Sequence, residues 1–273
     1  MTTEAAPGTT AGTTDPRSPT QSASRLRRVL FTVVGGLVAL ALLTAVPNVL
    51  APWVNIDIEG LSDPAHARWS LALEGAIDLL VVVCMIVSLI QPSRSAVLVQ
   101  HVLLTALLAA AVLVPFAGPT FLVTATMVLL FVLVYPYPSA LLTVRSGPGP
   151  SAGLLAMAVA SAGVLVPIAV QALRAQAVLP RGSGADFNVQ ATNAEHLLVL
   201  ALAGFLVATR RPGWTVLASA VAVTYGYLGV ASLALPDQPD SWRVVGGWAS
   251  LVWAASLGSA TVLVARRAGR VHR

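Results

Sequence analysis

Long apolar segments follow one another along almost the whole chain, separated by short polar stretches. A helix needs ~20 residues, rising 1.5 Å each, to cross roughly 30 Å of hydrocarbon. The segments have about this length, and they are continuous rather than alternating, so they predict helices and not barrel strands. Eight spans are expected, at about 29–50, 69–91, 96–115, 120–137, 152–173, 193–209, 214–235 and 245–265. The predicted fold class is therefore an all-α, polytopic transmembrane bundle.

The chain begins with a polar segment that differs from the rest. Residues 1–24 are rich in Thr, Ala, Ser, Pro and Gly, and we expect a disordered cytoplasmic tail ahead of one helical domain, 25–273. The basic stretch 25–28 then adjoins the first apolar run. A cleaved signal peptide is the alternative, but the run is longer than a signal core of about 7–15 residues. We favour an uncleaved anchor helix.

The arginines predict the orientation of the bundle. With the N-terminus inside, twelve of the sixteen basic residues lie in inner segments, and most acids of the loops lie in outer ones. Inner loops rich in arginine are typical of the cytoplasmic side. Trp53, Trp69 and Trp242 lie near outer boundaries, where indole rings favour the headgroup level. We expect cytoplasmic N- and C-termini (N-in/C-in) in a bacterial plasma membrane.

Composition excludes several classes of protein. Hydrophobic residues make up 56% of the chain and charged residues 10%, which leaves no room for a separate soluble domain. The net charge of +5 is explained by the arginines that set orientation, so the lipid bilayer and not nucleic acid is the expected partner. A single cysteine, Cys84, excludes an internal disulfide. We expect no cofactor.

Two acidic residues lie inside the second predicted span. Glu74 and Asp78 are four residues apart, so they share a helix face, about 7 Å and 13 Å from the outer end. An acidic residue at the centre of a membrane helix costs roughly 2.5–3.5 kcal/mol on insertion scales. We expect both side chains to face a polar space inside the bundle and one or both to carry a proton. The alternative is a structural role, as protonated acids hydrogen-bonded to neighbouring helices.

A second polar group begins the sixth span, where Asn193, Glu195 and His196 follow closely. Glu195 and His196 are candidates for a proton or ligand site, together with His66 and Glu74 around an outer vestibule. No spacing typical of a metal site is present, so we expect ordinary interfacial histidines rather than metal ligands.

The two halves of the chain resemble each other faintly. Asp78 precedes Arg94 by 16 residues, and Glu195 precedes Arg211 by the same number. Pro47 and Pro167 occupy similar places in the first and fifth spans, where kinks are expected. Two halves with four spans each would be parallel repeats, as in some transporters. Chance similarity among Leu-, Val- and Ala-rich helices is the alternative.

Two stretches of the chain resemble a known group of proteins. They are 66–78 continuing into 91–94, and 211–214 continuing through 229–236. They are similar to multi-pass membrane proteins of high-GC actinobacteria, a family without an established activity. The resemblance implies a habitat and a membrane location, and no chemistry.

Three functions remain open from the sequence. The first is a proton- or cation-coupled transporter, or a membrane protein that binds a small molecule or ion. The second is an accessory subunit of a membrane complex, in which the acids only hold helices together. The third is a membrane-embedded enzyme for lipid or isoprenoid substrates, with Asp78 as proton donor. No catalytic motif favours the enzyme.

The orientation can be tested with reporter fusions. Fusions after Arg145 and Arg211 should report a cytoplasmic location, because both follow inner arginines, and a fusion near Gly184 should report an external one. Alkaline phosphatase and green fluorescent protein fused at each position provide complementary readouts. An external signal after Arg211 would reverse the orientation.

Overall fold

The computed structural model describes residues 25–54, 64–117, 120–142, 149–179, 188–238 and 240–271. In these residues the secondary structure is entirely helical. The elements are α1 (Arg25–Leu42), the 3₁₀-helix η1 (Leu43–Leu50), α2 (Pro64–Ile90), a short 3₁₀ turn η2 (Pro92–Arg94), α3 (Ala96–Ala117), α4 (Thr120–Leu133), α5 (Pro138–Leu142), α6 (Ala152–Val178), α7 (Val189–Ala208), α8 (Trp214–Ala234) and α9 (Arg243–Val271).

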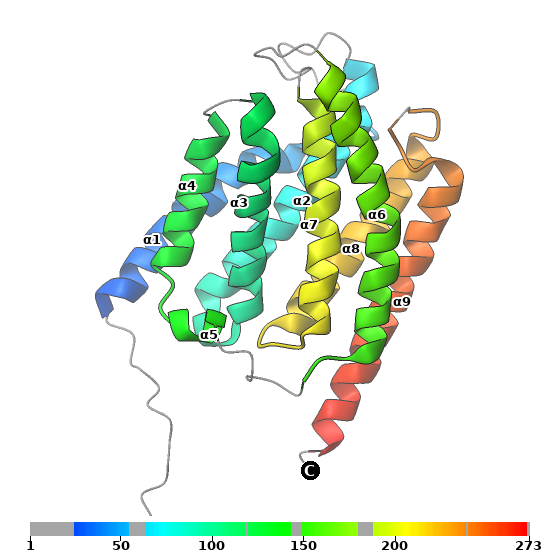
Figure 1. The fold of residues 1–273 in the computed structure, drawn as a ribbon. Helices are drawn as coiled ribbons and strands as arrows, with labels where there is room; N and C mark the ends of the chain where they lie inside the picture. Colours follow the sequence, from blue (N-terminus) through cyan, green and yellow to red (C-terminus); the bar gives the residue numbers. More distant parts are fainter. Residues whose placement is uncertain are drawn as a thin grey trace, which may run out of the picture.

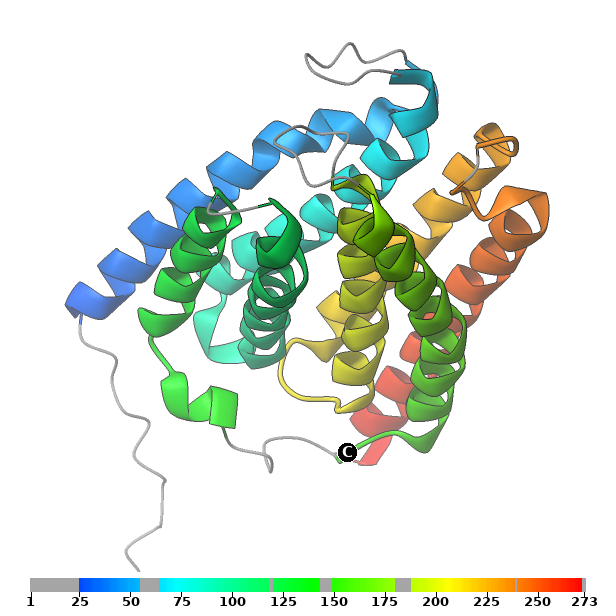
Figure 2. The ribbon, with the colours of Figure 1, turned by 45° about the horizontal axis from the view of Figure 1, so that its top comes forward.

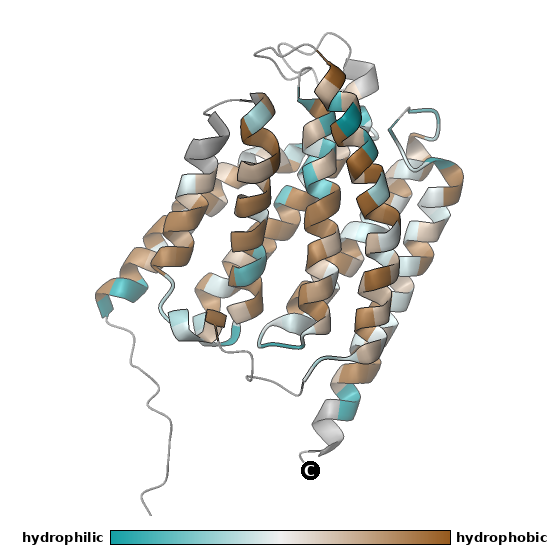
Figure 3. Ribbon diagram, in the orientation of Figure 1, coloured by the Kyte–Doolittle hydropathy of each residue, from teal (hydrophilic) through white to brown (hydrophobic). Residues whose placement is uncertain are grey.

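Seven helical segments in the described ranges are long and apolar enough to cross a membrane. They are Arg25–Leu50, Ala67–Ile90, Ala96–Phe116, Ala152–Val178, Val189–Ala208, Trp214–Ala234 and Arg243–Arg267. Their middles are apolar and their polar residues gather toward the two ends of the bundle (Figure 3). The all-α membrane bundle predicted from the apolar runs is therefore confirmed.

Successive long helices run up and down the bundle. The start of α1 and the end of α9 lie at the same end (Figure 1), and the turned view shows α1 crossing obliquely over the side of the bundle (Figure 2). The predicted disordered tail, 1–24, lies outside the described residues.

The fourth predicted span is shorter than expected. α4 ends at Leu133 instead of near 137, and its 14 residues rise only about 21 Å. Pro136 and Pro138 follow within five residues and lack the amide N–H that would continue the helix. The short helix α5 begins at Pro138. α4 packs against α3 and runs antiparallel to it, so it occupies the position of the predicted fourth span (Figure 1).

The two prolines that were expected to kink their helices behave differently. Pro47 cannot donate a hydrogen bond to the carbonyl of Leu43, and the chain changes there from α-helix to the 3₁₀-helix η1. Pro167 lies inside α6, which continues as one α-helix. The first membrane segment is therefore an α-helix followed by a tighter, proline-containing end.

Neighbouring helices hold η1 in place. The Arg68 guanidinium donates from Nε to the carbonyl of Ala51 at 2.8 Å and from a terminal nitrogen to that of Pro52. The Tyr227 hydroxyl donates to the carbonyl of Val49 at 2.8 Å. These bonds satisfy carbonyls at the end of η1 that have no partner within the helix. Arg68 thus caps η1 and does not simply extend toward water as a free charge.

The contacts between helices follow the same pattern in both halves of the chain. α1–η1 packs on α2 and α3 packs on α4, and correspondingly α6 packs on α7 and α8 packs on α9. The halves join crosswise, because α3 contacts α7 and α2 contacts α8. The equivalent connectors also meet, where the Val97 amide donates to the carbonyl of Pro212 at 3.2 Å. A contact pattern of this kind is the one expected for two parallel repeats.

A close approach at Gly75 generates a stability prediction. A Cβ atom on Gly75 would lie 2.6 Å from the Val49 nitrogen and 2.9 Å from the Asn48 carbonyl carbon, so Gly75→Ala must displace η1. We expect a loss of about 1–3 kcal/mol. Thermal unfolding of the purified protein in detergent, followed by tryptophan fluorescence, measures the change.

The matched control for this substitution is Gly36→Ala. Gly36 is exposed on α1, and no atom lies within 4 Å of the added methyl group. The unfolding temperature of this variant should equal or slightly exceed that of the wild type. Equal unfolding temperatures for the two variants would contradict a tight contact between η1 and α2.

Candidate functional site

The helix α2 brings Glu74 and Asp78 to the side of the bundle that faces η1 and α7. Both side chains are partly buried. Glu74 Oε2 accepts a hydrogen bond of 3.4 Å from Nδ2 of Asn48, which η1 carries into position. Because Gly75 has no side chain, the backbone of η1 can approach α2 closely enough for this contact. Asp78 accepts no hydrogen bond from any described residue.

The helix α7 contributes Glu195 and His196 to the same region. The Glu195 side chain is almost fully buried, with 2% of its surface exposed. Its Oε2 lies 3.2 Å from Nε2 of His196, which is also buried. The other imidazole nitrogen, Nδ1, has no hydrogen-bond partner among the described residues. His196 is therefore an interior residue and not the interfacial histidine that was expected.

The three acids form one group, which we call the carboxyl cluster: Glu74, Asp78 and Glu195. Glu195 is coupled electrostatically to Asp78 and Glu74, and Asp78 to Glu74, although no hydrogen bond joins the three carboxyl groups in the described structure. Asp78 and Glu195 lie in the first and second halves of the chain, each 16 residues before an arginine, Arg94 and Arg211. The structure thus brings predicted site residues from both halves to their junction.

The side chain of His66, expected at the outer vestibule, lies outside the described part of the structure. The Tyr225 hydroxyl pairs with the Ser161 hydroxyl on α6. Within the described ranges, no three His, Cys, Asp or Glu side chains are arranged to hold a metal ion.

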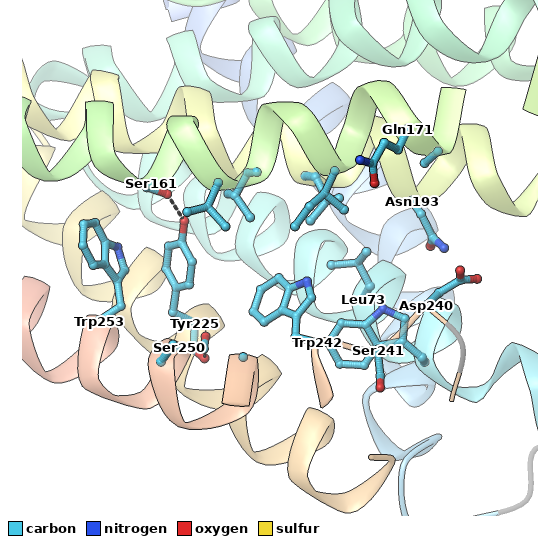
Figure 4. Close-up of a pocket in the computed structure, with 18 of the residues that line it drawn as sticks. Leu73, Ser161, Gln171, Asn193, Tyr225, Asp240, Ser241, Trp242, Ser250 and Trp253 are labelled. Carbon is cyan, nitrogen blue, oxygen red and sulfur yellow. Dashed lines mark hydrogen bonds between the residues drawn. The ribbon is translucent and has the colours of Figure 1, made fainter. Parts of the chain in front are cut away.

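A cavity of about 600 Å³ lies beside the cluster, and sequence reasoning missed it. It is bounded by α6 and α9 on two sides, with α7, α8 and the outer part of α2 between them (Figure 4). Its aromatic wall consists of Trp69, Trp242, Trp253 and Tyr225. Glu74, Asp78 and Glu195 do not line it.

The aromatic residues of the cavity pack against one another. The rings of Trp69 and Trp242 meet edge to face, with centroids 5.4 Å apart, and the rings of Tyr225 and Trp242 lie 6.5 Å apart. Only 2% of the Trp69 surface is exposed. The expectation that Trp69 anchors the chain at the lipid headgroups is therefore wrong, because its ring is buried within the protein against Trp242.

One buried amide belongs to the same cavity. Asn193 is 5% exposed, and its Nδ2 donates to the Ser70 hydroxyl on α2 at 3.0 Å. Its Oδ1 atom has no partner among the described residues and remains an available acceptor. In the sequence, the only indication of this cavity was the polar residue Asn193 near the start of a span.

The chain was also compared with known proteins. No family model, curated protein or solved structure matches it. The geometry of the carboxyl cluster and of the neighbouring cavity therefore carries the functional argument.

Proposed function

We propose that this integral membrane protein binds and moves a small ligand in a step coupled to proton binding at the carboxyl cluster. The observation that carries the proposal is that three electrostatically coupled carboxyl groups, on α2 and α7, lie buried or partly buried in the bundle. In the described structure no arginine forms an ion pair with any of them. Among the described residues, the cluster therefore has no fixed positive charge to balance it.

Electrostatic repulsion within such a cluster favours the binding of a proton or a cation. Neighbouring carboxylates repel each other, and burial removes the water that would stabilise their charge. A bound proton or cation relieves both costs, so occupancy of the cluster changes the electrostatic free energy of this part of the bundle. The His196 imidazole beside Glu195 adds a second proton-binding group.

The position of the cluster supports a transport role. Transporters built from repeats place substrate and coupling-ion sites near the midplane, where the repeats meet. Here Asp78 lies on α2 and Glu195 on α7, one helix from each half of the chain. The arginine-rich connectors at one end support a cytoplasmic location of both termini in a bacterial plasma membrane.

A structural role is the second candidate, and two hydrogen bonds favour it. Asn48 ties η1 to α2 through Glu74, and Asn193 ties α7 to α2 through Ser70. In that case the acids would stabilise the bundle without exchanging protons, and their amides would keep most of the hydrogen bonds.

Proton movement in proteoliposomes separates these functions. The wild-type protein, reconstituted with a trapped pH indicator, should take up protons when a potassium diffusion potential makes the interior negative. Asp78→Asn should lower the protein-dependent rate by roughly tenfold or more, because an amide has no proton to exchange in this range. Dicyclohexylcarbodiimide, which reacts with protonated carboxyl groups in apolar surroundings, should inhibit the wild type.

The control variant is Asp237→Asn, which removes an exposed acid that belongs to neither the cluster nor the neighbouring cavity and should leave the rate unchanged. Equal rates for wild type, Asp78→Asn and protein-free liposomes, together with a lower unfolding temperature for Asp78→Leu, would refute the coupling and favour the structural role.

A further inference from the structure

We propose that the cavity between α6 and α9 binds a bulky organic cation, in which a positively charged centre is surrounded by apolar groups. The inference rests on the proposed function in one respect, since it names the class of ligand whose movement the carboxyl cluster would drive. The site itself is separate from the cluster, and its binding can be measured alone.

Size and surface fit such a ligand. A cavity of about 600 Å³ is in the range of pockets that enclose drug-sized molecules, roughly 300–1,000 Å³. Most of its lining consists of aliphatic and aromatic side chains, which stabilise apolar groups by removing them from water. Trp242 lies at the centre of the aromatic wall, between Tyr225 and Asn193 in the close-up view (Figure 4).

The charge of the lining selects the sign of the ligand. Among the described residues that line the cavity there is one acid, Asp240, and no Lys, Arg or His. Gln190 Nε2 donates to Asp240 Oδ2 at 2.9 Å, which holds the Asp240 carboxylate beside the start of α7. Indole faces attract cations within about 6 Å of the ring centroid and do not attract anions. An organic cation is therefore favoured over an anion of the same size.

The buried amide adds a specific contact. Asn193 Oδ1 is a hydrogen-bond acceptor without a partner in the described structure, and Asn193 lines the cavity. Leaving a buried acceptor unpaired costs free energy, which a donor on the ligand would recover. A protonated amine satisfies this acceptor and the cation preference of the aromatic wall together.

The cavity and the carboxyl cluster share two helices. On α2, Trp69 and Leu73 face the cavity, while Glu74 and Asp78 belong to the cluster. On α7, Asn193 faces the cavity and Glu195 the cluster. A change in the position of α2 relative to α7 would act on both sites, which gives a physical route for coupling.

A pair of probes of matched shape tests the charge preference. Tetraphenylphosphonium and tetraphenylborate have nearly the same size and apolar surface but opposite charges. Equilibrium dialysis with the purified full-length protein in detergent, corrected for protein-free micelles, should show saturable binding of tetraphenylphosphonium. The affinity for tetraphenylborate should be weaker by roughly tenfold or more, since it meets an acid and ring faces that disfavour it.

Two substitutions on α9 test the location. Ala249 is an exposed residue that lines the cavity, and Ala249→Phe should weaken tetraphenylphosphonium binding by roughly tenfold or more by filling the space. Ala255 is exposed on the same helix and does not line the cavity, so Ala255→Phe should bind as the wild type does. Trp242→Leu, which keeps an apolar side chain but removes the ring face, should weaken binding by roughly threefold to tenfold.

The outcomes distinguish this inference from the proposed function. Tetraphenylphosphonium binding that Asp78→Asn retains and Ala249→Phe removes supports the cavity, whether or not protons move in proteoliposomes. Equal binding of both probes, stronger binding of tetraphenylborate, or binding that Ala249→Phe leaves unchanged would overturn it.

Discussion

The apolar interior of a bilayer offers no hydrogen-bond partners, and this constraint determines where the polar groups of this chain lie. Carbonyls left open by proline and by helix ends are satisfied within the protein. Arg68 and Tyr227 bond carbonyls at the end of η1, and Arg211 bonds the carbonyls of Ala140 and Leu141 at the end of α5. Arginine thus caps helix ends besides setting the orientation of the bundle.

Against this background the carboxyl cluster and the cavity are exceptions. Polar atoms near the junction of the two halves keep unused capacity, as the unpaired Asn193 Oδ1 and His196 Nδ1 show. A chain selected only for stability would be expected to pair such atoms, because each unpaired group costs free energy. Asn193 and His196 lie three residues apart on α7, beside the cavity and the cluster, which is the physical reason for looking for ligands there.

The sequence predicts the features that depend on local pattern. Apolar length predicts the spans, and the four-residue spacing of Glu74 and Asp78 places them on one face of α2. It does not predict which helices pack together, so the approach of Glu195 to these acids and the aromatic wall around Trp242 could not be foreseen. Trp69 is an example, because the sequence alone does not tell whether lipid or another part of the protein covers an indole at the end of a span.

The two halves share a proline at equivalent places, yet they differ mechanically. Around Pro167 the helix α6 keeps its α-helical form and packs along α7, whereas Pro47 lies in a 3₁₀ segment with weaker hydrogen-bond geometry. This compliant segment carries Asn48, which touches Glu74. The acids therefore lie between the continuous helices α6 and α7 and the less regular η1. If the helices rearrange around the acids, we expect η1 to move more than α6 and α7.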